Sequence, residues 1–224
     1  MSLLEHLRAN NKLQQRAIQE IIRRDLTAFT CKTFETVSPG ETLLMNWHIK
    51  AMAYVLMLVL SGRIKRLLIT MPPRYLKSIM ASVAFPAFAL GRDPSKRIIC
   101  ASYAEALAID LANKCRLVLN SDWFWRCFPQ CCISTEKNTE TEFLTSARGG
   151  RFSTTVDGSM TGFGGNLIVI DDAMNANDMA SPSVLAKVRS WYEGPLLSRL
   201  DSKASDAIVI VQQRLHPDDL AGVV

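Results

Sequence analysis

Short apolar runs alternate with helical segments along this chain, and this order restricts the possible folds more than any other feature. The runs "RLLITM" at 66–71 and "RIICAS" at 97–102 are typical of strands, and the helical segment 77–90 lies between them. A strand, a helix and a strand in this order predict parallel neighbours joined by a crossover helix. We therefore expect an open, mostly parallel α/β sheet flanked by helices.

Later runs extend this predicted sheet. The segment "NLIVIDD" at 166–172 is the most strand-like in the chain, and "DAIVIVQQR" at 206–214 predicts a last buried strand. "EFLTS" and "RFSTTV" flank an Arg-Gly-Gly turn at 148–150 and predict a hairpin. A capping box of Ser102 and Glu105 predicts the start of a helix after the strand at 97–102.

The N-terminal part of the chain differs in character from the rest. Apolar residues recur at helical spacing from 3 to 26 amid many charges, which predicts an amphipathic arm or lid helix. A looser segment at 27–43 leads into a second predicted helix at 47–60. We divide the chain into an N-terminal helical arm or lid at 1–45 and an α/β domain at 46–224.

Composition excludes some classes of protein. With 224 residues, 48% of them hydrophobic, the chain can build a sizeable core. The 26 Lys and Arg residues exceed the 21 acidic residues, and the resulting charge of +5 permits a polyanionic partner without requiring one. The longest apolar run, 51–60, is well short of the roughly 18 residues that a membrane span needs. No secretory segment precedes it, so we expect a cytoplasmic protein whose six cysteines are free thiols.

The segment "LLITMPPRYLKSIMAS" at 67–82 places a Pro-Pro-Arg turn and a Lys-Ser pair between an apolar run and a helix. A phosphate-binding loop usually reads G-x-x-x-x-G-K-[ST], and here Met71 and Leu76 occupy the two glycine positions. Lys77 and Ser78 remain. The flanking strand and helix are in the order that aims backbone N–H groups at a phosphate.

The missing glycines leave two interpretations of this loop open. Leu76 must fit a side chain where the backbone approaches the ligand closely, and it needs unusual backbone dihedrals. The proline pair at 72–73, however, can stiffen the turn that glycines would otherwise permit. By itself the segment favours a surface turn before a core helix slightly over phosphate binding.

A pair of carboxylates changes this balance. Asp171 and Asp172 follow the apolar run "LIVI", at the strand end where open α/β sheets bind ligands. Asp171 is then in the expected place for a Mg²⁺ ligand, and Asp172 is free to orient or deprotonate an attacking water. Two aspartates can also end a strand merely as solvated residues, so the joint occurrence with the loop is the stronger evidence. Gln212, Gln213 and Arg214 end the next predicted strand, either as a γ-phosphate sensor or as ordinary polar residues.

Four segments in this order carry a resemblance to a known family: "GRIKRLLITMPPRYLKS", "GRDPSKRIICASYAEALAIDLA", "DGSMTGFGGNLIVIDDAMNANDMASPSVLAKVRSWYEGPLLSRL" and "IVIVQQRLHPDDLAG". Together they resemble the N-terminal ATPase of the tailed-bacteriophage terminase large subunit, the motor that packages DNA into procapsids. The similarity covers residues 46–222. It implies a P-loop NTPase of the RecA/ASCE-like type, with ATP and Mg²⁺ as cofactors.

The resemblance also implies roles for individual residues. In that family the loop commonly reads Pro-Pro-Arg-x-Gly-Lys-Ser, from which Leu76 departs. The implied nucleotide-binding loop consists of Pro73, Arg74, Tyr75, Leu76, Lys77, Ser78 and Ile79. The implied metal ligands are Ser78 and Asp171, and the implied catalytic residues are Lys77, Arg74, Gln213 at the coupling position and Asp172 as the base. The usual base is Glu, and the shorter Asp172 reaches less far.

Other positions follow from the same resemblance. Trp47 and His48 fall where the family places an adenine-recognition element, although a Trp at a helix start also packs into a core. Phe163 stands where relatives often have an Arg that contacts the phosphates of a neighbouring subunit. That leaves Arg148 and Arg151 as candidates for such a finger, with Arg74 able to act in cis.

The resemblance implies partners as well. They are double-stranded DNA, bound through its phosphates without sequence preference, the portal protein, the small terminase subunit, and further copies in a ring, with a monomer in isolation as the other possibility. The implied location is the cytoplasm of a bacterial host. The family's nuclease domain has no room in this chain, so we expect no DNA cleavage from it. Two rival hypotheses stay open: a helicase-like ATPase, and a degenerate, non-hydrolysing module that assembles on DNA or a portal.

Overall fold

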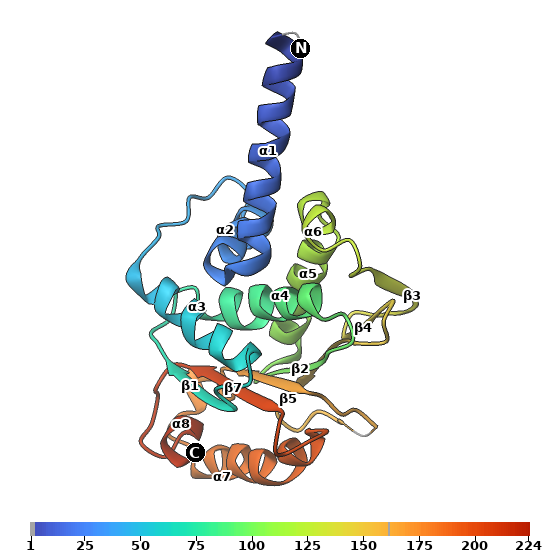
Figure 1. Ribbon diagram of the computed structural model, residues 1–224. Coiled ribbons are helices and arrows are strands. Elements are labelled where there is room, and N and C mark those ends of the chain that lie inside the picture. Colours follow the sequence, from blue (N-terminus) through green and yellow to red (C-terminus); the bar gives the residue numbers. More distant parts are fainter. Residues whose placement is uncertain (1–2, 161) are drawn as a thin grey trace.

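The apolar runs form one sheet in the computed structural model, which describes residues 3–160 and 162–224, with side chains from residue 12 onward (Figure 1). Within this described part the sheet has seven strands in the order β1-β7-β6-β2-β5-β4-β3. The first five in that order are parallel, and β4 and β3 continue the sheet antiparallel. The strands are β1 (Arg66–Thr70), β2 (Arg97–Ser102), β3 (Ile133–Asn138), β4 (Glu142–Thr145), β5 (Gly150–Thr155), β6 (Leu167–Asp171) and β7 (Ala207–Gln212). The predicted open, mostly parallel sheet and the β4–β5 hairpin are confirmed.

The register brings the carboxyl ends of the central strands together. Asp171 at the end of β6 lies between Ser102 of β2 and Val211 of β7, and Thr70 of β1 lies beside Gln212. In parallel strands these ends share one edge, so the segments that leave the strands there are neighbours. The predicted loop after β1, the two aspartates and the glutamines therefore meet at one edge of the sheet.

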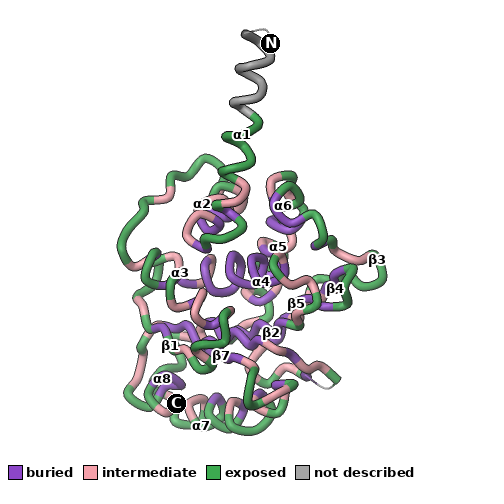
Figure 2. The backbone as a smooth tube through the Cα atoms, in the orientation of Figure 1, coloured by how far each residue is buried: buried purple, intermediate pink, exposed green. Residues whose placement is uncertain are grey.

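Helices cover both faces of the sheet (Figure 1). One face carries α3 (Trp47–Leu60), the π-helix η1 (Ile79–Ala84), α4 (Phe85–Arg92), α5 (Glu105–Leu119) and α6 (Asp122–Cys127). The other carries α7 (Pro182–Trp191), the short helices η2 (Ala176–Asp178), η3 (Tyr192–Leu196) and η4 (Leu197–Arg199), and α8 (Leu220–Val223). Each face has its own apolar cluster, and residues of β2, β6 and β7 alternate between the two. Figure 2 shows that burial is greatest in α4 and the central strands.

The N-terminal segment consists of two helices, α1 (Leu3–Arg24) and α2 (Leu26–Val37). The prediction of a loose segment at 27–43 was wrong over most of its length, because Asp25 caps α2 by accepting a hydrogen bond from the Ala28 N–H. α1 projects from the body (Figure 1), whereas Phe29 of α2 is fully buried in the same apolar cluster as α4. Residues 1 and 2 of the predicted arm lie outside the described residues. The boundary at residue 45 stays a prediction.

One local prediction failed and one strand was missed, for the same reason. Ser102 does not open a capping box, because it is the last residue of β2; Ala104 precedes α5 and makes no side-chain cap. The polar segment at β3 was not predicted as a strand, and only its pairing with β4 keeps it extended at the sheet edge. In both cases pairing within the sheet overrides the local sequence signal.

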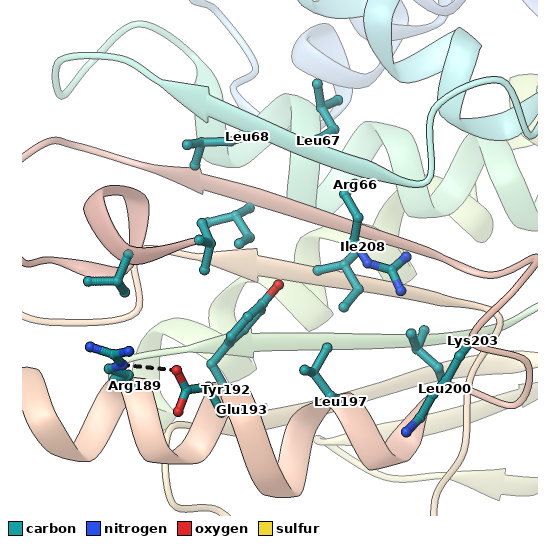
Figure 3. Close-up of a pocket in the computed structure, with 13 residues that line it drawn as sticks. Arg66, Leu67, Leu68, Arg189, Tyr192, Glu193, Leu197, Leu200, Lys203 and Ile208 are labelled. Atoms are coloured by element: carbon teal, nitrogen blue, oxygen red, sulfur yellow. Dashed lines mark hydrogen bonds and ion pairs between the residues drawn. The ribbon is translucent and has the colours of Figure 1, made fainter.

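A cavity of about 480 Å³ lies between β1, β7 and the helical segment that begins with α7 (Figure 3). Its walls are mainly apolar, with Leu68, Tyr192 and Leu197 among them, and Arg189 pairs with Glu193 at 2.9 Å on its border. None of the residues predicted to bind nucleotide lines it. Among the described helices, none is both long and apolar enough to cross a membrane.

Candidate nucleotide site

The loop between β1 and η1 adopts a backbone that normally needs glycine. Arg74 has φ 67° and Leu76 has φ 64°, both in the left-handed region. The strain of such a conformation costs about 1 to 2 kcal/mol for a residue with a Cβ. Leu76 stands where the related loop motif has its second glycine, and it is partly buried against the core. The chain therefore keeps the loop conformation without the residue that usually permits it.

This strain leads to a first prediction. Leu76→Gly is expected to keep the loop conformation and to leave the free energy of unfolding within about 1 kcal/mol, since relief of strain offsets lost apolar contact. Leu76→Val is expected to destabilise the chain by about 1 to 2 kcal/mol more, because a β-branched residue is poorly tolerated at positive φ. Urea denaturation of the two variants tests this. Greater stability of the valine variant would show that the left-handed conformation is not what the position requires.

Lys77 and Asp172 form an ion pair at the carboxyl edge of the sheet. Lys77 is only 5% exposed, and its ammonium donates to both carboxylate oxygens of Asp172. Asp172 itself has φ 49° and accepts a hydrogen bond of 3.0 Å from the Gln213 backbone N–H. The loop after β1 and the ends of β6 and β7 are thus joined through one carboxylate.

Asp171 lies behind this pair and is 1% exposed. Its Oδ1 accepts a hydrogen bond of 3.0 Å from Ser78 Oγ, and its Oδ2 accepts one of 2.8 Å from Ser82 Oγ. Burial raises the pKa of Asp171 to about 6, and the neighbouring Asp172 charge adds to the rise. The hydrogen bonds from the two serines and the Lys77 charge oppose it.

The raised pKa predicts a pH-dependent stability. Because the folded pKa of about 6 exceeds the usual 3.8, the stability associated with Asp171 is full below pH 4 and falls as the pH rises through 6. At pH 8 the cost of ionising Asp171 amounts to about 3 kcal/mol. Asp171→Asn is therefore expected to be more stable than the wild type at pH 8, with the difference vanishing near pH 4. Denaturant titrations at pH 4 and pH 8 measure this difference in the free energy of unfolding. An equal difference at both pH values would contradict the raised pKa of Asp171.

Ser78 and Asp171 fit a magnesium ion. Their oxygens are 3.0 Å apart, hard oxygen donors are those that Mg²⁺ prefers, and no cation pairs with Asp171 directly in the described part of the chain. No cluster of three or more His, Cys, Asp or Glu side chains suited to a metal occurs among the described residues. Mg²⁺ in phosphate sites commonly uses one or two protein ligands, with phosphate and water supplying the rest.

Aromatic side chains border the loop. Trp47 is 76% exposed, so it is not packed into the core. His48 lies beside it, and the rings of His48 and Tyr75 meet edge to face with centroids 5.3 Å apart. Helix α3 thereby places two aromatic rings next to the loop, whose Tyr75 is half exposed. The exposed Trp47 ring offers a face on which a purine base can stack.

The arginine candidates lie in different places. Arg74 is exposed in the loop itself. Arg148 is exposed at the turn before β5, at the amino ends of the parallel strands and therefore away from the loop. Arg151 is 1% exposed, so burial rules out this candidate for a finger that contacts a neighbouring subunit. Phe163 stacks on Phe152 with centroids 3.8 Å apart.

The remaining predicted residues fall at the same edge. Gln212 ends β7 and is 3% exposed, and Gln213 follows it with its N–H on Asp172. Pro73 is exposed in the loop, and Ile79 is the first residue of η1. Sequence reasoning missed Ser82, although its spacing of four from Ser78 puts both hydroxyls on one helical face.

The loop and the acidic pair lie at the carboxyl edge of an open, mostly parallel α/β sheet flanked by helices, the fold class that the sequence predicted. Among matching solved structures is that of the HK97 bacteriophage large terminase, with a TM-score of 0.59 and 11% identity. The match covers 90% of this chain and 40% of that chain, so the chain spans about 40% of that terminase's length. At this identity the likeness establishes the fold. No protein-family model matches the sequence, and no curated protein matches it either.

Proposed function

We propose that this chain binds and hydrolyses ATP with Mg²⁺, as the motor domain of a terminase-like DNA-packaging machine. One observation carries the proposal: Lys77, Ser78, Asp171 and Asp172, from two segments far apart in the sequence, converge at the carboxyl edge of a parallel sheet. A cation for phosphate, a hydroxyl and carboxylate for a metal, and a second carboxylate for water are the parts that phosphoryl transfer needs.

The Lys77–Asp172 ion pair implies a sequence of events when ATP binds. Lys77 leaves Asp172 when triphosphate oxygens, which carry more negative charge than one carboxylate, take its ammonium. Asp172 then keeps the Gln213 N–H as its donor and is free to orient a water and accept its proton. Ser78 and Asp171 would hold Mg²⁺, which would neutralise phosphate charge when bound. Arg74 lies exposed in the same loop, where it can add positive charge in cis.

The adenine ring of ATP is assigned to the aromatic residues beside the loop. Trp47 stacks on adenine and His48 hydrogen-bonds to its edge, with Tyr75 closing the loop side. Trp47→Ala is expected to weaken ATP binding about tenfold or more, since stacking on an aromatic ring is worth about 1 to 3 kcal/mol per base. Calorimetric titration with ATP and with inorganic triphosphate checks this. Equal weakening for both ligands would place Trp47 outside base recognition.

The wider role follows from the likeness to the terminase. The proposed partners are double-stranded DNA, a portal protein, a small terminase subunit and further copies of the chain in a ring, in the cytoplasm of a bacterial host. The net charge of +5 suits contact with DNA phosphates. Residues 1–45 are proposed as an arm or lid beside the ATPase domain at 46–224.

The decisive experiment is titration of the wild-type chain with a fluorescent ATP analogue, with and without Mg²⁺. Saturable binding that Mg²⁺ strengthens and unlabelled ATP competes away is expected. Release of phosphate at a slow rate should accompany it, because an arginine from a neighbour is absent in the isolated chain. Failure to bind would favour the non-hydrolysing assembly module. Strand separation by the full-length protein would favour the helicase-like alternative.

A further inference from the structure

Arg151 on β5 is a buried charge without an obvious purpose. It is 1% exposed, and no acidic side chain pairs with it in the described part of the chain. Its Nε has no hydrogen-bond partner there. Burying a guanidinium without a carboxylate costs several kcal/mol, so a chain that keeps one gains something other than stability from it.

The guanidinium instead contacts the segment that follows the phosphate loop. Nη1 donates to Ser153 Oγ on the same strand, and Nη2 donates to the Ser82 backbone oxygen at 3.4 Å. Ser82 lies within the π-helix η1, and its hydroxyl is the one that holds Oδ2 of Asp171 at 2.8 Å. A continuous path of contacts therefore runs from Arg151 through Ser82 to Asp171.

The sheet geometry allows this path. Arg151 and Leu167 both lie opposite Ile98 of β2, so they occupy the same level on β5 and β6. Asp171 is four residues beyond Leu167 and hence on the same face, the one that η1 covers. Ser82 reaches across this face to Asp171 while its carbonyl reaches Arg151. π-helical turns in otherwise α-helical segments are frequent at functional sites, where they redirect side chains.

We propose that Arg151 is a positioning residue that acts through Ser82 to fix the orientation of Asp171 for its metal. Ser82 occupies Oδ2, which leaves Oδ1 directed toward Ser78 and the loop. When Ser78 turns to a metal, Ser82 is the hydroxyl that still restrains the carboxylate. Arg151 restrains Ser82 in turn by its contact with the carbonyl. This inference rests on the proposed nucleotide site.

The test measures metal affinity directly, with Mn²⁺ as the probe and ADP present, by electron paramagnetic resonance. Ser82→Ala and Arg151→Met are each expected to weaken Mn²⁺ binding about tenfold, the usual effect of losing a partner of a metal ligand. ADP affinity in EDTA should stay unchanged. The double variant should bind Mn²⁺ no more weakly than either single variant, because both changes interrupt one path. Arg151→Lys should restore part of the loss.

Ser153→Ala is the matched control, since it removes the hydrogen bond that Arg151 Nη1 donates to Ser153 and leaves Ser82 intact. Its Mn²⁺ affinity is expected to equal that of the wild type. Additive losses in the double variant, or wild-type affinity in Arg151→Met, would overturn the inference. If Arg151→Met does not fold, Ser82→Ala decides alone, and unchanged Mn²⁺ affinity refutes the path. A wild-type chain that binds neither ADP nor Mn²⁺ would instead refute the proposed function.

Discussion

Asp172→Asn is expected to abolish turnover of ATP while ATP binding is kept or tightened. An amide cannot accept the proton of the attacking water, and loss of a positioned base lowers the rate by about 10² to 10⁴. The same change removes the negative partner of Lys77, which is 5% exposed and contacts both Asp172 oxygens. Phosphate then no longer competes with a carboxylate for that ammonium, and affinity should rise by up to about tenfold.

Rapid-quench measurement of single-turnover hydrolysis and a nucleotide titration separate the two effects. Asp178→Asn is a suitable control, because Asp178 is an exposed acid in the short helix η2 after the same strand. It should change neither rate nor affinity. Hydrolysis at the wild-type rate in Asp172→Asn would remove Asp172 from the chemistry and leave its pairing with Lys77 as a purely structural contact.

Lys77→Ala is expected to weaken the binding of Mg²⁺ and ATP by at least about tenfold to a hundredfold. The ammonium is the one cation paired with Asp172 among the described residues, and a charged hydrogen bond contributes about 1.5 to 3 kcal/mol. The loss should be greater for ATP than for ADP, because the γ-phosphate adds charge that Lys77 would contact. Adenosine, which lacks phosphate, should bind the variant and the wild type equally weakly.

Lys187→Ala provides a matched control. Lys187 is an exposed lysine of α7 on the opposite face of the sheet, paired with Asp157 rather than with an edge carboxylate. Circular dichroism of both variants should match that of the wild type, since the Asp172 side chain is 26% exposed and water can solvate it once Lys77 is removed. Equal ATP affinity in Lys77→Ala and the wild type would be incompatible with a phosphate site at this loop.

Much of the site was predictable because it depends on local chain order. A strand of four buried apolar residues followed by two aspartates puts both carboxylates at the carboxyl edge of any parallel sheet. The loop at 71–78 is held between a strand and a helix whose starts are also visible in the sequence. These features need no knowledge of which strands are neighbours.

Other features depend on contacts between distant segments. That Trp47 does not pack in the core is decided by its 76% exposure, which no local pattern shows. Arg151 looks like any strand-edge arginine in sequence, yet it is 1% exposed, because β5 lies between β2 and β4 and α5 packs on it. Its path to Asp171 joins residues 69 and 89 positions apart, through Ser82.

The sequence alone determined the alternation of strands and helices, the glycine-free loop with Lys77 and Ser78, and the acidic end of β6, because short-range periodicity and turn chemistry encode them. The tertiary structure decided the strand order, the ion pair of Lys77 with Asp172, and the burial of Ser82 and Arg151. The physical reason is that a side chain's partner and its exposure are properties of the packed sheet, which brings together residues that the chain keeps far apart.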